Sequence, residues 1–223
     1  KKNEESKTNF ETIVRLLKEG EEANTAGNYD VAVAKYDEGY RVNPDFAGSA
    51  PTLLVRRADS QKSRAVAINN KAAKSTDPTE KVTNLNLAKA DLGGSMEGFK
   101  MALDILAKAN PGDITPDNAA KIKASSISGM KEVMRLSGAI KQVDDRVITI
   151  AKEMMPQILA ADADAKAKTD TRLFYATMFL GSTDTAVGVA AFRDVLTDSP
   201  DSVDGLAGLG LSLTNAGFIN FQN

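Results

Sequence analysis

The residues of this chain that could do chemistry are charged, because the sequence contains neither histidine nor cysteine. Histidine is the commonest general base and metal ligand, and cysteine supplies the thiolate nucleophile. Their absence excludes Ser-His-Asp and Cys-His catalysis as well as thiolate zinc sites. We therefore expect a protein that is not an enzyme and holds no metal ion or cofactor.

Two acidic pairs, Asp144-Asp145 and Asp162/Asp164, are the remaining candidates for carboxylate chemistry. Adjacent side chains on a helix point about 100° apart, so Asp144 and Asp145 would not converge on one proton or metal ion. The Asp162-x-Asp164 pair lacks the glycine and the later glutamate of a calcium loop. These residues are expected to form solvated helix surface.

Glycine-rich stretches do not form a nucleotide-binding motif. Gly93 and Gly98 have the spacing of a phosphate loop, but Phe99 stands where the loop requires lysine. Gly205, Gly208 and Gly210 have the wrong spacing for a dinucleotide loop, and no strand precedes them. Close approach of helices is the better explanation, at least for Gly210.

A basic segment at residues 56–74 is the best candidate for binding a partner. The segment contains six basic residues and a single acidic one, Asp59. We expect Arg56 and Arg57 late on one helix, and Arg64, Lys71 and Lys74 on the next. Four of them are candidates to line a groove that receives an acidic peptide through bidentate contacts, namely Arg56, Arg57, Arg64 and Lys71. The alternative is a scattered, solvated face.

Nucleic acid is not an expected partner, and neither is a bilayer interior. The net charge is −2, and no aromatic residue interleaves the basic segment to stack on bases. No apolar run approaches the roughly 20 residues that span a bilayer. The abundance of alanine, with 26% charged and only 5% aromatic residues, favours helices.

Residues 10–45 predict one helix hairpin. Residues 10–25 have an amphipathic pattern, Gly27-Asn28 forms a turn, and Ala32, Tyr36 and Gly39 share one face of a second helix. Pro44 cannot continue that helix. A lone pair of helices cannot bury both of its faces, so further copies are expected.

Proline spacing indicates those copies, because Pro44, Pro78 and Pro111 are 34 and 33 residues apart. Helices at 80–92 and 96–109 are expected to join at Gly93-Gly94-Ser95. Residues 1–9 are then a tail, and residues 10–112 form three hairpins. Residues 113–168 are expected to hold longer helices, either degenerate repeats or a separate insertion.

Two expected helices occupy that middle region. Thr115 and Pro116 start the first. The second carries Ile140, Val143 and Val147, and Pro156 should kink or end it. The alternating ADADAKAK stretch that follows reads as a solvated last turn and a linker.

The C-terminal region, residues 169–223, predicts another hairpin and the first helix of a further unit. Helices at 172–180 and 186–196 flank a turn at 181–184, and the last helix starts after Ser199-Pro200-Asp201. Leu206, Leu209, Gly210 and Leu213 share one face of that last helix, and Gly217 is expected at its end.

These patterns resemble the tetratricopeptide repeat family. The matching residues in the first unit are Leu16, Gly20, Gly27, Tyr29, Ala32, Tyr36, Gly39 and Pro44, and those in the last are Leu206, Leu209, Gly210, Leu213 and Gly217. The resemblance implies an all-α fold, an α-solenoid of stacked antiparallel hairpins in a right-handed superhelix. It also implies a concave groove that binds a protein or peptide.

We therefore expect a protein–protein interaction scaffold with a peptide partner. One alternative is head-to-tail self-assembly between the basic segment and an acidic C-terminal unit that carries five aspartates against Arg193. Another is a small-ligand carrier that uses Met130, Met134, Met154 and Met155. The charged start KKNEESK favours export to a bacterial periplasm or cell envelope over the cytoplasm.

Overall fold

The computed structural model describes the backbone of residues 2–181 and 184–222, and the side chains of residues 7–180 and 184–217. Within those residues every regular element is a helix, as the sequence predicts. In chain order they are α1 (Lys2–Thr25), α2 (Tyr29–Val42), α3 (Ala50–Lys74), α4 (Pro78–Ala107), α5 (Pro116–Ile140), α6 (Asp145–Ala160), α7 (Ala165–Thr177), the short 3-10 helix η1 (Met178–Gly181), α8 (Thr185–Asp198) and α9 (Val203–Gln222).

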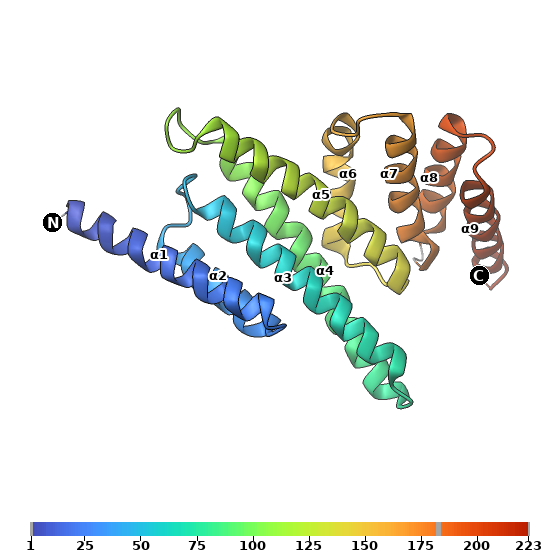
Figure 1. The fold of residues 1–223 in the computed structure, drawn as a ribbon. Helices are drawn as coiled ribbons and strands as arrows, with labels where there is room; N and C mark the ends of the chain where they lie inside the picture. Colours follow the sequence, from blue (N-terminus) through green and yellow to red (C-terminus); the bar gives the residue numbers. More distant parts are fainter. Residues whose placement is uncertain (1, 182–183, 223) are drawn as a thin grey trace.

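The helices pack mainly on their neighbours in the chain, so that α1 and α9 lie at opposite ends of the molecule (Figure 1). Contacts also link odd-numbered helices in series, from α3 to α5, from α5 to α7 and from α7 to α9. The face shared by these odd-numbered helices is where most of the pockets described below lie.

The first hairpin has its turn where the sequence predicts it. Gly27 takes a positive φ of 75°, and Tyr36 and Leu16 are fully buried between α1 and α2. A Cβ atom at Gly20 would lie 2.5 Å from the Tyr36 ring, so glycine is what admits the ring. The prediction of a tail at residues 1–9 is wrong, because α1 already begins at Lys2.

Residues 10–112 form two hairpins rather than the predicted three. The helix α4 runs without a break through Gly93-Gly94-Ser95, where the sequence predicts a turn. The packing partners explain the error. A Cβ at Gly94 would lie 2.6 Å from the Gln61 amide, and one at Gly98 would lie 3.1 Å from Ala58. These glycines bring α4 close to α3 instead of turning the chain.

The prolines mark helix boundaries, not equal repeats. Pro78 is the first residue of α4, and the Asp77 carboxylate caps that helix by accepting from the Thr79 N–H at 2.8 Å. Pro111 follows the end of α4. Because α3 and α4 are single long helices, the 34-residue spacing from Pro44 to Pro78 contains one helix and its loops.

The middle region has the predicted helices with shifted bounds. Thr115 caps α5 and Pro116 is its first residue, as predicted. Ile140 ends α5 instead of opening the next helix, because Asp144 caps α6. Pro156 neither ends nor breaks α6, which continues to Ala160 with Met154 and Ile158 buried on either side of the proline.

The ADADAKAK stretch is mostly exposed, as predicted, but Asp162 is an exception. Asp162 is buried, forms an ion pair with Lys131 of α5, and accepts a 2.8 Å hydrogen bond from the Thr171 hydroxyl of α7. Asp164 caps α7 by accepting from the Ala167 N–H at 2.8 Å. Asp162 therefore links α5 to α7, whereas Asp164 is exposed, as predicted, and caps its own helix.

The last helix buries only part of the predicted face, on which Leu209 alone packs inward, against the cluster around Phe192. Leu206 and Leu213 are 54% and 47% exposed, and nothing lies within 4 Å of a Cβ built at Gly210. Gly208 instead meets the Phe192 ring of α8, at 2.1 Å from such a Cβ. The helix also continues past Gly217. Ser182 and Thr183 of the predicted turn, and the side chains of Phe218 and Phe221, lie outside the described residues.

The main core lies between α3, α4, α5 and α6. Phe99 of α4 is fully buried there, and a Cβ at Gly129 of α5 would lie 2.2 Å from its ring. Met130, Met134 and Met154 are buried in the same cluster, and Met155 packs against it. The methionines proposed for a ligand carrier thus fill the core.

Candidate functional site

The basic segment lies on one helix, α3, instead of the two expected. Arg57 is 16% exposed and donates a 2.7 Å hydrogen bond to the Asp37 carboxylate of α2. Its guanidinium also lies 5.9 Å from the centre of the Tyr40 ring. Arg57 is therefore held against α2 and does not line an open groove.

Arg64 is more tightly held than Arg57. It donates to both oxygens of Asp91 on α4, at 2.8 Å and 2.5 Å, and to Asp30 on α2 at 2.5 Å. These hydrogen bonds, chiefly those with Asp91, raise the pKa of the Arg64 guanidinium. A single side chain thus ties three helices together.

Lys71 also has a partner within the chain, since its ammonium lies 3.0 Å from the Glu80 carboxylate of α4. Hydrogen bonding to Lys71, and then to Ser75, lowers the pKa of Glu80. The hypothesis that Arg57 and Arg64 line an open groove is therefore corrected, because acids of neighbouring helices hold both. The Lys71 side chain is 66% exposed, so its pair with Glu80 is a weak surface pair. These residues join α3 to its neighbours.

Arg56 differs from the other three, because it lies on the side of α3 that faces α5. It lines a pocket of about 360 Å³, which we call the polar pocket. Lys121 and Asn118 of α5 line the opposite wall, and Val55 and Ile122 are its apolar members. The remaining lining side chains are polar: Thr52, Asp59 and Ser125.

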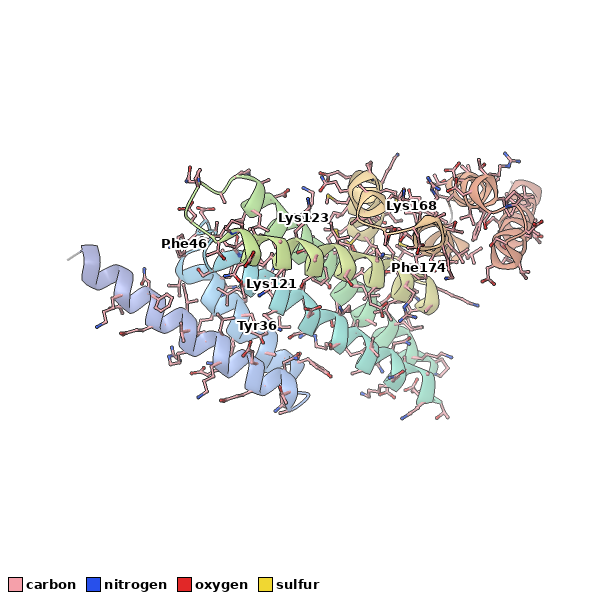
Figure 2. The ribbon with its side chains drawn as sticks, turned by 45° about the horizontal axis from the view of Figure 1, so that its top comes forward. Tyr36, Phe46, Lys121, Lys123, Lys168 and Phe174 are labelled. Carbon is pink, nitrogen blue, oxygen red and sulfur yellow. The ribbon has the colours of Figure 1, made fainter. Side chains whose placement is uncertain are left out.

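Sequence reasoning missed Asn118 and Lys121. The signal available was their spacing of three residues in the first turns of α5, directly after the Thr115 cap, which places both on one side of the helix. Figure 2 shows Lys121 and Lys123 on opposite sides of α5. Lys123 lines a different pocket, with residues of α4 and α6.

The charges around the polar pocket leave it able to take an anion. Asp59 is already paired with Lys62 at 2.8 Å. Arg56 and Glu21 are 3.4 Å apart and both about half exposed, so this surface pair contributes at most about 1 kcal/mol. Among the described residues no ion pair is found for Lys121. Its ammonium, with the amide of Asn118 and nearby hydroxyls, offers hydrogen-bond donors.

A second pocket lies further along the same two helices. This apolar pocket, of about 170 Å³, is lined mainly by aliphatic side chains, with Asn69 and Asn70 at its edge: Ala65, Val66, Leu92, Leu136, Ala139 and Ile140. Beyond it, a pocket of about 450 Å³ lies between α5, α7 and α9 and includes Phe174 (Figure 2).

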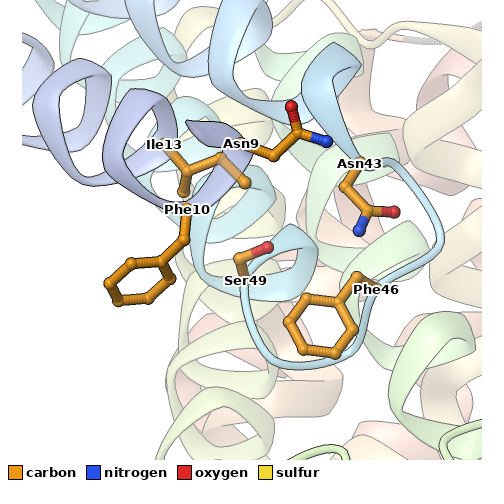
Figure 3. Close-up of a pocket in the computed structure, with 6 residues that line it drawn as sticks. All are labelled: Asn9, Phe10, Ile13, Asn43, Phe46 and Ser49. Atoms are coloured by element: carbon orange, nitrogen blue, oxygen red, sulfur yellow. The ribbon is translucent and has the colours of Figure 1, made fainter. Parts of the chain in front are cut away.

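A separate pocket of about 340 Å³ lies at the N-terminal end, between α1 and the loop that joins α2 to α3. Phe10 and Phe46 are 64% and 41% exposed, and their rings flank Ser49, with Asn9 and Asn43 above (Figure 3). The Ser49 oxygen is buried and has no hydrogen-bond partner. Sequence reasoning did not predict this pocket.

The repeat-signature residues divide between the two ends of the molecule. Leu16, Gly20, Ala32, Tyr36 and Gly39 are buried in or beside the first hairpin. Tyr29, Pro44 and Leu209 are partly buried, whereas Gly27, Gly210 and Gly217 are exposed.

Comparison of the chain with protein-family models, with curated proteins and with solved structures finds no match. None of the helices in the described part of the chain has the length and apolar character needed to cross a bilayer. No group of three or more acidic side chains among those residues could hold a metal ion.

Proposed function

We propose that this chain is a non-enzymatic interaction scaffold built as a tetratricopeptide-like α-solenoid, and that it binds a peptide of a partner protein between α3 and α5. The observation that carries the proposal is the polar pocket, where Arg56 and Lys121 face each other across adjacent odd-numbered helices. Of the basic residues that sequence analysis favoured, Arg57 and Arg64 are held in part-buried ion pairs, so the anion-binding role rests on Arg56 together with Lys121.

The arrangement of the pockets supports the same conclusion. The polar pocket, the apolar pocket and the pocket that includes Phe174 are all lined mainly by odd-numbered helices. In a solenoid of hairpins, the first helices of successive units line the concave side. A bound peptide lying across this face would contact first the hydrogen-bond donors of the polar pocket and then the apolar pockets.

The proposal is tested with Arg56→Glu and Lys121→Glu, singly and together, against acidic and basic peptides of equal length. We expect the wild type to bind acidic peptides more tightly, and the double variant to lose roughly tenfold or more in affinity. Lys123→Glu is the matched control, since it makes the same charge change on the other side of α5. Equal binding of acidic peptides by all variants would contradict the proposal.

Self-assembly is a second candidate, favoured by the exposed apolar side chains of α9: Val203, Leu206, Leu211 and Leu213. The head-to-tail version driven by charge loses its support, because Arg57, Arg64 and Lys71 are paired within the chain. Sedimentation tests the apolar version. Association that persists in high salt and is abolished by Leu206→Glu would support it, and a monomer at every concentration would end it.

A further inference from the structure

We infer that the partner peptide has two anchors, a carboxylate and an aliphatic side chain, separated by about six residues of extended chain. This inference rests on the proposed function and adds to it the chemistry and spacing of the ligand. It follows from finding two pockets of opposite character between the same pair of helices.

The distance between the pockets sets the spacing. The polar pocket uses residues 52–59 of α3 and 118–125 of α5, and the apolar pocket uses residues 65–70 and 136–140. The two helices therefore run in the same direction. At about 1.5 Å per residue, the pocket centres are roughly 18 Å apart along α3 and roughly 25 Å apart along α5. An extended chain at about 3.3 Å per residue covers about 20 Å with six residues.

An extended peptide fits this place better than a helix does. Because α3 and α5 contact each other directly, their axes are about 8–10 Å apart. A bound peptide therefore lies over the groove between the two helices. An extended chain presents free N–H and C=O groups there, whereas a helix has already paired its own. Asn69 and Asn70 beside the apolar pocket can donate to and accept from the peptide groups of such a strand.

The two pockets select different anchors. Lys121 and Asn118 supply a cation and an amide donor for a carboxylate, whereas Asp59 in the same pocket is occupied by Lys62. The apolar pocket, at about 170 Å³, is close to the size of a cavity that takes a benzene-sized group. Its walls include Leu136 and the buried Leu92, so a leucine or isoleucine side chain suits it.

The stretch between the pockets carries charges of both signs. Glu132 of α5 is paired with Arg135, whose hydrogen bonds lower the pKa of Glu132, and Lys62 of α3 is paired with Asp59. Peptide residues that pass over this stretch meet no net charge. Affinity is therefore expected to depend on the spacing of the anchors and little on the residues between them.

The test uses capped Gly-Ser peptides that carry one glutamate and one leucine, separated by three, six or ten residues, in both orders. Binding is followed by chemical shifts of the isotope-labelled full chain. We expect one order with a spacing of six to bind at least fivefold more tightly than the other spacings. Replacing glutamate by glutamine should remove most of that advantage. A variant with a free C-terminal carboxylate in place of glutamate shows which kind of carboxylate is bound.

Two variants test the two anchors separately. Lys121→Glu should weaken the six-residue peptide by roughly tenfold and leave its glutamine analogue unchanged. Ala139→Met, which fills the apolar pocket, should remove the preference for leucine over serine. Lys123→Glu should change neither result. Lys121, Lys123 and Ala139 are exposed, so each variant is expected to fold like the wild type. Circular dichroism checks that the helix content is unchanged.

The outcomes separate the inference from the function on which it rests. Binding at α3 and α5 with the same affinity at every spacing would overturn the two-anchor inference and leave the interaction site standing. Shifts confined to other helices, or none at peptide concentrations far above physiological, would overturn the proposed peptide site and the inference with it.

Discussion

The first hairpin and the last helix carry the same alternation of large and small residues, yet only the first buries it. In α1–α2, Tyr36 fills the space that Gly20 leaves, and its exposed fraction is 1%. In α9, Leu206, Gly210 and Leu213 have a similar spacing, but the leucines are about half exposed. Such spacing therefore identifies a face that is able to pack, and says nothing about which segment covers it.

The largest expected effect comes from truncating a large residue in each region. Tyr36→Ala should lower the free energy of unfolding by about 3–5 kcal/mol, because it leaves a cavity between α1 and α2. Leu206→Ala should change it by no more than about 0.5 kcal/mol, as at other exposed positions. Urea unfolding followed by circular dichroism measures both. A cost for Leu206→Ala comparable to that of Tyr36→Ala would mean that another molecule covers α9 in solution.

Adding a methyl group should give effects of opposite sign in the two regions. Gly20→Ala forces a Cβ into the buried Tyr36 ring and should destabilise the chain by about 1–3 kcal/mol. Gly210→Ala meets open space in a helix interior and should stabilise by up to about 1 kcal/mol, from helix propensity alone. Thermal melts compare the two variants. A loss of stability in Gly210→Ala would show that a neighbour approaches α9 there.

Acid should weaken the first hairpin slightly. Hydrogen bonds from Lys35, and then Arg15, lower the pKa of Glu19, and the Lys35 contact at 2.8 Å joins α1 to α2. Because the folded pKa is below the unfolded value, this contribution is complete above about pH 4.5 and is lost as the pH falls through the folded pKa.

The measurement is the fall in urea midpoint between neutral pH and pH 3, in wild type and in Glu19→Gln. We expect a slightly smaller fall in the variant, because glutamine does not titrate. The charge-matched control is Glu11→Gln, at an exposed pair within α1 whose charged atoms are 3.9 Å apart. An identical fall in wild type and Glu19→Gln would show that the Glu19–Lys35 pair does not contribute to the loss of stability in acid.

The sequence predicts the helices well wherever local chemistry decides. Gly27, Thr115 and Pro116 act through their own backbone conformation or nearest N–H groups, and each lies at the helix boundary that the sequence indicates. Gly93 and Gly94 mislead because glycine serves both turns and close packing. Only the positions of Gln61 and Arg146, far away in the sequence, show which of the two applies.

The candidate site could be predicted only in part, for a similar reason. A run of basic residues shows where positive charge lies, but not which acids will neutralise it. Asp91 lies 27 residues from Arg64, and no local rule pairs them. Arg56 was identified because it belongs to that run. Lys121 lies outside that run and becomes notable only when α5 is laid beside α3.

The packing of each helix on its neighbours in the chain has a mechanical consequence. If the two ends of the molecule were pulled apart, few contacts between distant segments would bear the load, since α1 and α9 do not contact each other. We expect extension in steps, with hairpins peeling away from the ends. The guanidinium of Arg64 on α3 bonds to both α2 and α4, and we expect these bonds to delay the separation of α3 from either helix.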